Sequence, residues 1–287
     1  MMINSVNNLD LTEYNAYRLN SKCLRAWFPG DENDLLEIYR NNKSRRVVIL
    51  GNGNNIILSK GYYNEEFIIL NGNFNKITVC GLIIEAEAGA TLRQLSEEGL
   101  KHSLTGLEIF YDIPSSVGGA VVMNAGTKEG EIKDVLAKVR FLDLKDMQIK
   151  ELAREEIDFE YRNSFFQKHP DKIVLKAWFQ LAKGNNRKIK AKMEENKKTR
   201  WEKQPRELPN CGSVFKRPPG RFVGPMLDEL GMKGFTIGGA MISPKHSGFI
   251  VNKGNATGTN ILSIIAEVQN RVKDKFGVLL EIEQRII

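Results

Sequence analysis

Apolar residues in the first part of the chain gather in short runs, and one segment has helical spacing. Residues 47–58 (VVILGNGNNIIL) predict a buried strand, a glycine–asparagine loop and a second short strand. Leucines recur at helical spacing in 91–100, and Thr91 is a suitable N-cap for that helix. Further strands are predicted at residues 66–70, 82–88, 132–144 and 172–182. Because strand and helix do not alternate regularly, the pattern predicts an α+β fold and not a doubly wound sheet.

The C-terminal segment has the clearest amphipathic pattern. Apolar residues three and four positions apart predict a helix over 259–276, which Thr257 or Thr259 would cap. Gly277 suits the left-handed conformation that ends many helices. The next residues alternate between apolar and charged, which predicts a final strand. Its apolar face holds Val278, Leu280 and Ile282, and its polar face holds Glu281, Glu283 and Arg285.

Basic residues are concentrated in 183–206, which holds ten of them and three acidic residues, in a chain of formal net charge +7. We interpret this segment as the linker and first helix of a second unit, with Ile189 and Met193 packed inward and the lysines in water. A second interpretation is that the basic residues attract a polyanionic small substrate. Nucleic-acid binding has the least support, because neither aromatic platforms nor a recognisable reading helix accompanies the charge.

The composition is that of an ordinary folded protein of 287 residues, with 41% hydrophobic and 27% charged residues. The chain has no run of eighteen apolar residues and its first residues form no secretory signal, so neither membrane insertion nor secretion is expected. Cys23, Cys80 and Cys211 are widely spaced and form neither a disulfide framework nor a zinc pattern. We therefore expect a cytoplasmic protein with reduced cysteines and no metal site.

A glycine–asparagine loop of five residues, Gly51, Asn52, Gly53, Asn54 and Asn55, separates two predicted strands. It lacks the third glycine and the helix of a Rossmann fingerprint, and it has no Gly-Lys-Ser/Thr of a Walker loop. Its glycines would let successive backbone N–H groups point into one concavity, which suits a phosphate or pyrophosphate. A plain turn between strands explains this stretch at least as well.

Small residues dominate the segment DIPSSVGGAVVMNAG at 112–126. Such residues let a flat ring or a backbone approach closely, which would suit a bound cofactor. A tight crossing of two parts of the chain would select the same residues, and spacing alone does not separate the two interpretations.

Arg162 lies among aromatic and apolar residues in FEYRNSFF, residues 159–166. In an extended segment it would share a face with Ser164. It is either a surface residue whose stem is packed or a cation that stabilises developing negative charge.

Ser213, in NCGSVFKRPP at 210–219, lacks the surroundings of a hydrolase nucleophile. The G-x-S-x-G motif is absent, and the three histidines, His102, His169 and His246, give weak support for a triad. Taken alone, it is most simply a turn serine beside a strand. The last helix, which follows PKHSGFIVN and NATG, has an N-terminus that could receive an anion.

Taken in order, these segments resemble the UDP-N-acetylenolpyruvoylglucosamine reductases, the MurB family of peptidoglycan synthesis. The likeness spans nearly the whole chain, and the compact length with KRPPG after Ser213 resembles the shorter, type II-like branch that lacks an extra substrate loop. The segments that carry it are GNGNN (51–55), GLEIFYDIPSSVGGAVVMNAG (106–126), YRNSFF (161–166), CGSVFKRPPGRF (211–222), GMKGFTIGGAMISPKHSGFIVN (231–252) and LEIEQRII (280–287).

The resemblance implies an α+β protein of two domains. Residues 1–184 would form an FAD-binding domain of the vanillyl-alcohol-oxidase (PCMH) type, with two subdomains that divide near residue 70, and 185–287 a smaller α+β substrate-binding domain. The implied reaction is that of an NADPH-dependent flavoprotein oxidoreductase. NADPH reduces FAD, and hydride then passes to the enolpyruvyl methylene carbon of the UDP-sugar, which gives UDP-N-acetylmuramate. We expect a cytoplasmic monomer whose partner is a UDP-sugar, with no nucleic-acid and no membrane partner.

The resemblance also implies which residues form the site. Arg162, Ser213 and Glu283 match the family's catalytic arginine, serine and glutamate; spacing alone does not choose between Glu281 and Glu283. Ser213 would be a general acid to carbon, because an alcohol is far too weak an acid for anything but a strong base formed in the site, such as an enolate-like intermediate. The implied FAD-binding residues are Gly51, Asn52, Gly53, Asn54, Asn55, Ile113, Pro114, Ser115, Ser116, Gly118, Gly119, Asn124 and Gly126. Lys216 and Arg217 would attract the UDP diphosphate.

Some positions of the cofactor segments differ from the family pattern, such as Ser115, where a glycine usually follows the proline. A diverged paralogue that binds a flavin or a nucleotide sugar without turnover is therefore the alternative hypothesis. The complete set of Arg162, Ser213 and Glu283 argues against it.

Overall fold

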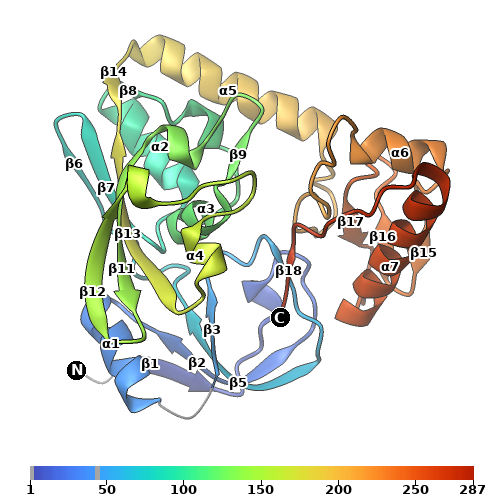
Figure 1. Ribbon diagram of the computed structural model, residues 1–287, viewed down its shortest axis with the longest axis horizontal. Coiled ribbons are helices and arrows are strands. Elements are labelled where there is room, and N and C mark those ends of the chain that lie inside the picture. Colours follow the sequence, from blue (N-terminus) through green and yellow to red (C-terminus); the bar gives the residue numbers. More distant parts are fainter. Residues whose placement is uncertain (1–2, 43–45) are drawn as a thin grey trace. The chain divides into compact units, whose positions relative to one another are not determined.

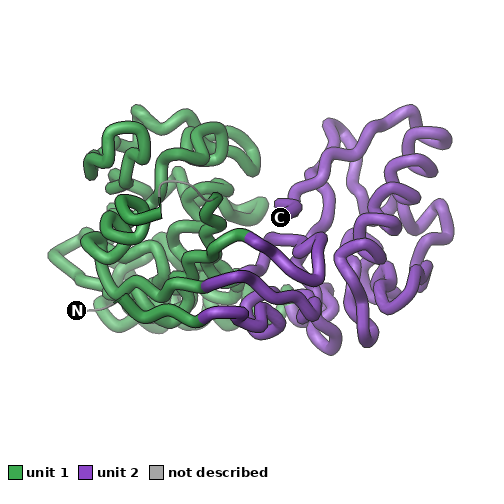
Figure 2. The backbone as a smooth tube through the Cα atoms, turned by 90° about the horizontal axis from the view of Figure 1, so that it is seen from below, with its two compact units in different colours: residues 1–6, 26–52, 65–200 green, residues 7–25, 53–64, 201–287 purple. Residues whose placement is uncertain are grey.

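The computed structural model describes residues 3–42 and 46–287, and the chain forms two compact units (Figure 2). The first unit consists of residues 1–6, 26–52 and 65–200, and the second of residues 7–25, 53–64 and 201–287. Each unit therefore contains segments that are far apart in the sequence.

A five-stranded antiparallel sheet forms the centre of the first unit (Figure 1). Its strand order is β12-β11-β13-β7-β6. The register between β11 and β13 shifts twice, which marks bulges in the middle of the sheet. The strands are β6 (Ile77–Cys80), β7 (Ile83–Glu87), β11 (Leu136–Asp143), β12 (Gln148–Ala153) and β13 (Lys172–Gln180).

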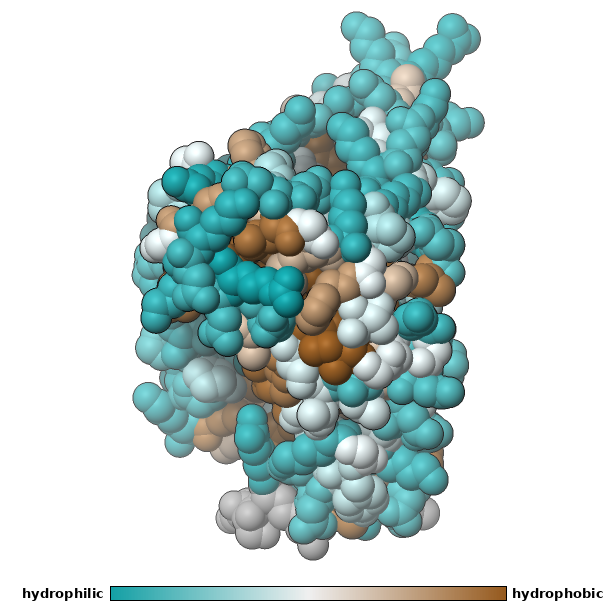
Figure 3. All heavy atoms as spheres, turned by 90° about the vertical axis from the view of Figure 1, so that its right-hand side faces the viewer, coloured by the Kyte–Doolittle hydropathy of each residue, from teal (hydrophilic) through white to brown (hydrophobic). Residues whose placement is uncertain are grey.

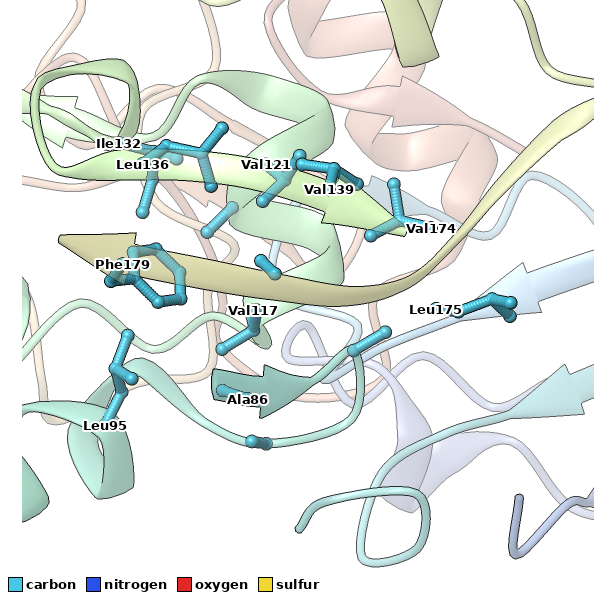
Figure 4. Packing of buried hydrophobic residues seen from close by; sticks show 14 of the residues in the cluster. Ala86, Leu95, Val117, Val121, Ile132, Leu136, Val139, Val174, Leu175 and Phe179 are labelled. Carbon is cyan, nitrogen blue, oxygen red and sulfur yellow. The ribbon is translucent and has the colours of Figure 1, made fainter. Parts of the chain in front are cut away.

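Helices cover the core of this unit. Val117 and Val121 are one turn apart on the same helix, α3, and both are completely buried beside β13 and β11 (Figure 4). Phe179 of β13 and Leu95 of α2 belong to the same hydrophobic cluster. The helices are α1 (Glu32–Asn41), α2 (Leu92–Lys101), α3 (Val117–Met123), α4 (Phe165–Lys168) and α5 (Asn186–Lys203), with short 3₁₀ turns at η2 (Glu108–Phe110), η3 (Ile132–Asp134) and η4 (Arg154–Glu156).

A four-stranded sheet has the strand order β1-β2-β5-β3. Within the first unit, β3 and the end of β5 pair in parallel. Two strand pairs are shorter, β9 with β10 and β8 with β14. The strands are β1 (Asn4–Asn7), β2 (Lys22–Phe28), β3 (Val47–Leu50), β5 (Tyr62–Ile69), β8 (Leu104–Thr105), β9 (Gly126–Thr127), β10 (Gly130–Glu131) and β14 (Ala182–Lys183).

The second unit is built around the long helix α7 (Gly258–Phe276), which packs against β15 and β16 (Figure 1). Thr257 caps this helix in a capping box with Asn260, and Gly277 ends it in the left-handed conformation at φ 66°. The remaining elements are η1 (Thr12–Tyr14), β4 (Ile56–Ile57), α6 (Val223–Glu229), β15 (Thr236–Ile237), β16 (Ala240–Ile242), β17 (Ile250–Asn252) and β18 (Arg285–Ile286).

The helices predicted at 91–100 and 259–276 are confirmed, and so is the Thr91 cap. The predicted final strand is only partly correct. Regular pairing is confined to β18, and the residues before it bond to a neighbouring segment through isolated pairs. The basic helix α5 buries Ile189 and Met193 as predicted, but most of it groups with the first unit. The predicted domain boundary between 184 and 185 stays a prediction.

The described ranges 3–42 and 46–287 contain no helix that is long and apolar enough to span a membrane. The same residues contain no cluster of histidine, cysteine or acidic side chains that could hold a metal ion. All three cysteines are free, Cys80 exposed and Cys23 and Cys211 buried.

The cysteines give a first testable prediction. Burial raises the pKa of the Cys211 thiol to about 12, so it stays protonated in mildly alkaline buffer as well as shielded from reagents. A chromogenic disulfide reagent should therefore label Cys80 quickly in the folded protein, and Cys23 and Cys211 only after unfolding in denaturant. The Cys80→Ser variant should lose the fast phase. Fast labelling of Cys211 in that folded variant would contradict the structure.

Candidate active site

Two predicted cofactor segments, far apart in sequence, meet in the first unit. Gly51 follows the end of β3, and Ser116 is the residue that caps α3. A Cβ atom on Gly51 would lie 2.1 Å from Ser116 Oγ, so a side chain there would displace this capping hydroxyl. The structure therefore brings Gly51 together with the 113–119 segment. Asn52, the next residue, is half-buried.

The first N–H groups of α3 are bonded within the protein. Val117 N–H donates to Ala90 O at 2.7 Å, and Gly118 N–H donates to Ala88 O at 2.9 Å. A Cβ on Gly118 would come within 2.9 Å of the Ala88 side chain. Close packing against the end of β7 therefore explains Gly118. This agrees with the interpretation of the segment as a tight crossing of two parts of the chain. Gly119 N–H donates to the capping oxygen of Ser116 at 3.2 Å.

Residues 113–115 form a tight turn before this helix. Ile113 N–H donates to Phe110 O, and Ser115 N–H donates to Ile113 O at 2.8 Å. Pro114 is exposed, and the Ser115 hydroxyl donates to Ser116 O at 3.0 Å. The sequence motif is thus a turn followed by a capped helix, and not an irregular loop throughout.

At the other end of α3, Asn124 holds a cluster of polar groups together. It is completely buried and adopts the left-handed conformation, with φ 44° and ψ 54°. Its Nδ2 donates to Glu131 Oε2 at 2.9 Å and to Glu160 O at 3.0 Å, and its Oδ1 accepts from Lys133 N–H at 3.2 Å. Asparagine tolerates this backbone conformation better than other residues with a Cβ.

The Arg162 guanidinium belongs to the same cluster. Its Nη2 donates to Gly126 O at 2.8 Å, its Nη1 donates to Asn124 O at 3.2 Å, and Glu131 Oε1 lies 3.5 Å from Nη1. Its side chain is 16% exposed. Gly126 itself has no room for a side chain, because a Cβ there would lie 2.2 Å from Gly130 O. Arg162 is therefore a positioned cation with a partly buried head.

The backbone at Arg162 corrects the interpretation of this segment as extended. Glu160 and Asn163 bond to each other through both N–H groups, so Tyr161 and Arg162 are the central residues of a two-residue turn. Arg162 has φ 53°, a left-handed conformation that is uncommon for a residue other than glycine. Ser164 is completely buried and donates to Val122 O at 2.7 Å, so it is a structural residue here.

The second half of the glycine–asparagine loop lies in the second unit. Gly53 has φ 63°, and a Cβ there would lie 2.1 Å from Tyr14 O. Asn55 bonds to the C-terminal segment: its Nδ2 donates to Glu283 O at 3.2 Å, and its carbonyl accepts from Arg285 N–H at 2.9 Å. Asn54, between them, is half-buried.

In the second unit, the segment that begins at Ser213 is hydrogen-bonded on both sides, and Glu283 is one of its partners. Val214 N–H donates to Gly248 O at 3.0 Å on one side, and Val214 O accepts from Glu283 N–H at 2.8 Å on the other. Ser213 also pairs with Phe249. The Ser213 side chain is exposed and Glu283 is half-exposed. The structure therefore brings the backbones of these two predicted catalytic residues together, while Arg162 belongs to the first unit.

Lys216 and Arg217 follow Ser213 directly. Lys216 Nζ lies 2.5 Å from Glu281 Oε1, and the Arg217 guanidinium lies 4.6 Å from the centre of the Phe222 ring. Phe222 is 59% exposed. Figure 3 shows a largely hydrophilic face on which apolar side chains also reach the surface. An arginine over an aromatic ring keeps its charge available to an anion while the ring orients its plane.

Comparison with known proteins identifies the family. Residues 25–152 match the FAD binding domain model, and residues 204–287 match the model of the UDP-N-acetylenolpyruvoylglucosamine reductase C-terminal domain. A relative with this name from Francisella tularensis subsp. tularensis is 40% identical over 97% of this chain and 99% of its own length. Another from Caldanaerobacter subterraneus subsp. tengcongensis is 43% identical over 98% of this chain and 92% of its own.

The chain belongs to the UDP-N-acetylenolpyruvoylglucosamine reductase family. The crystal structure of UDP-N-acetylenolpyruvylglucosamine reductase (MurB) from Thermus caldophilus is similar along the entire chain. Its TM-score is 0.83 at 32% identity, and the match covers 100% of this chain and 99% of the other. Membership in the family confirms the resemblance, and with it the α+β fold that joins an FAD-binding domain to a MurB C-terminal domain.

Three residues around the predicted site residues were not predicted from the sequence. Glu131 pairs with Arg162, Gln284 donates to the carbonyls of residues 211–213, and Tyr17 donates to Gln284. One signal was present: Gln284 continues the apolar face of Leu280 and Ile282, where a polar residue is unexpected. Which residues bind cofactor or react stays a prediction.

A second prediction follows from Asn124 in this reductase. Replacing it by alanine or by glycine removes the same side-chain hydrogen bonds, but only alanine also has to adopt the left-handed backbone. Both variants should lose stability, and Asn124→Ala should lose about 1 kcal/mol more than Asn124→Gly. Equilibrium unfolding in urea measures the difference, provided that the free energy of unfolding depends equally on urea concentration in both variants. An alanine variant as stable as the glycine variant would show that the backbone conformation costs nothing.

Proposed function

We propose that this protein reduces UDP-N-acetylglucosamine enolpyruvate to UDP-N-acetylmuramate with NADPH and FAD, in the synthesis of peptidoglycan precursor. The observation that carries this conclusion is 40% identity to a UDP-N-acetylenolpyruvoylglucosamine reductase over 97% of this chain and 99% of the relative. A family member of this kind is an NADPH-dependent flavoprotein oxidoreductase.

An FAD in this protein is supported by the match of residues 25–152 to the FAD binding domain model. Gly51, directly after β3, packs against the Ser116 hydroxyl at the start of α3, so two of the predicted cofactor segments lie together. FAD, when bound, accepts hydride from NADPH and supplies it to the substrate. The proposed FAD residues are those of 51–55, 113–116, 118–119, Asn124 and Gly126.

Ser213 would deliver a proton to the substrate carbon next to the one that receives hydride. Its side chain is exposed, while its backbone is fixed by the pairing with Phe249. A hydroxyl donates its proton only to a strong base, and the enolate-like substrate is such a base. No histidine is needed for this step.

Arg162 and Glu283 would complete the site. The contacts of the Arg162 guanidinium with Gly126 O and Asn124 O fix its direction, so it would lie against the substrate carboxylate without reorganising. Glu283 is the glutamate that follows the family pattern. Glu281, the other glutamate of this segment, is 70% exposed and forms an ion pair with Lys216.

The UDP-sugar is the proposed partner, and Lys216 and Arg217 are the proposed residues for its diphosphate. A cytoplasmic monomer with no nucleic-acid and no membrane partner is the simplest state for this reaction. The alternative, a paralogue without turnover, predicts flavin that NADPH reduces and that the UDP-enolpyruvyl sugar fails to reoxidise.

Ser213→Ala tests the assignment. The FAD-loaded variant should lose flavin colour with NADPH at the wild-type rate, because the serine takes no part in that step. Colour should return about 100-fold more slowly with UDP-N-acetylglucosamine enolpyruvate, since a positioned acid contributes at least that much. Anaerobic stopped-flow absorbance measures both rates.

Ser213→Cys is the matched control, because a thiol can still donate a proton, and it should retain part of the second rate. Failure of a folded Ser213→Ala variant to be reduced by NADPH would overturn the role. So would a wild-type rate of colour return.

A further inference from the structure

Gln284 is a polar side chain buried inside the second unit, directly after the proposed catalytic Glu283. It is 3% exposed. Its amide is used on both sides: Oε1 accepts from the Tyr17 hydroxyl at 2.9 Å, and Nε2 faces the carbonyl oxygens of residues 211–213. Burying an amide is costly unless its donors and acceptors are bonded, so this arrangement holds both groups in place.

The chemistry of the partners allows only one orientation of this amide. Backbone carbonyls accept and never donate, so the NH₂ group must face Cys211 O at 3.1 Å, Gly212 O at 3.3 Å and Ser213 O at 3.5 Å. Burial raises the pKa of Tyr17 well above its usual value, so its hydroxyl stays protonated and donates to Oε1.

The carbonyls of 211–213 converge on Gln284 because the chain bends there. Gly212 has φ 78°, a conformation open to glycine, and no atom crowds the position of its missing side chain. The backbone conformation, and not space, therefore requires this glycine. A single amide donor at the inside of the bend then fixes the peptide units on both sides of Gly212, including that of Ser213.

Tyr17 is itself anchored. It is completely buried, and its carbonyl accepts from Asn252 Nδ2 at 2.8 Å. Asn252 Oδ1 in turn accepts from Gly254 N–H at 2.9 Å and Ala256 N–H at 3.1 Å. A continuous set of neutral hydrogen bonds thus runs from the segment before α7 through Tyr17 and Gln284 to the loop of Ser213.

We propose that Gln284, oriented by Tyr17, is a positioning residue that sets the placement of Ser213 relative to Glu283; this rests on the function proposed above. Gln284 takes no proton and touches no reacting atom. It holds the 211–213 carbonyls from the residue directly after Glu283, whose N–H is bonded to Val214 O. Displacement of a reacting group by about 1 Å costs roughly 100-fold in rate, so loss of this amide should act on the step that uses Ser213.

The test compares Gln284→Leu with Gln269→Leu. Gln269, on α7, also donates its amide to a carbonyl of the second unit, that of Leu280 at 2.8 Å, but is not bonded to residues 211–213. Gln269→Leu loses one amide-to-carbonyl bond, whereas Gln284→Leu loses the amide contacts with residues 211–213 and the bond from Tyr17. Gln284→Leu should slow the return of flavin colour with the UDP-enolpyruvyl sugar about tenfold or more, and leave reduction by NADPH within about twofold. Gln269→Leu should leave both rates near wild type.

A pH profile of Gln284→Glu gives a readout that a merely structural role would not change. An ionised glutamate at this position would face carbonyl oxygens and repel them, whereas a protonated one would donate as the glutamine does. Burial raises the pKa of such a carboxyl. The rate of this variant relative to wild type should therefore rise as pH falls, while the same ratio for Gln284→Leu stays flat. Tyr17 and Cys211, the titratable neighbours, stay neutral because burial raises the pKa of both, that of Cys211 to about 12.

Tyr17→Phe provides a milder variant in case Gln284→Leu fails to fold. It keeps the ring and removes only the donor to Oε1, so it should slow colour return severalfold and spare reduction. Rates in Gln284→Leu and Tyr17→Phe that match Gln269→Leu would overturn the positioning role alone. Wild-type protein that NADPH reduces but the substrate does not reoxidise would overturn the proposed function, and this role with it.

Discussion

Backbone hydrogen bonding along residues 213–216 is the constraint on which the second unit depends. This segment bonds to Gly248 on one side and to Glu283 on the other, yet it forms no long regular strand. Few hydrogen bonds therefore fix the position of the Ser213 loop. The loss of one of them would shift the loop more than the loss of one bond inside a wide sheet. Side-chain amides provide hydrogen bonds that a regular strand would receive from neighbouring backbone. Buried polar residues are therefore found around this loop.

A different constraint shapes the first unit, where α3 begins against the end of β7. Its first N–H groups are bonded to carbonyls of residues 88 and 90, so the helix approaches closely and glycine is required at 118. The same approach places the cap of α3 against Gly51. A motif of small residues can therefore serve packing and ligand binding at once, and Gly118 is explained by packing without excluding a cofactor nearby.

Local signals decided what could be predicted from the sequence. The helices at 91–100 and 259–276 have their periodicity and capping residues in adjacent positions, and both were predicted. Helix α3 was not, because two glycines and three valines give it low propensity and only packing on the sheet makes it helical. The turn at Arg162 had no signal either, since a left-handed arginine depends on partners such as Asn124 that lie far away in sequence.

The neutral character of the Tyr17–Gln284 pair matters for the chemistry assigned to its neighbours. A buried charge next to Ser213 and Glu283 would shift their protonation by Coulomb interaction in a poorly screened interior. A phenol and an amide fix geometry through directional hydrogen bonds and carry no net charge. The cations of the proposed site, Lys216 and Arg217, follow Ser213 on the same segment. Arg217 is exposed, whereas Lys216 is largely buried and paired with Glu281. Position and charge are thus supplied by different residues of one short loop.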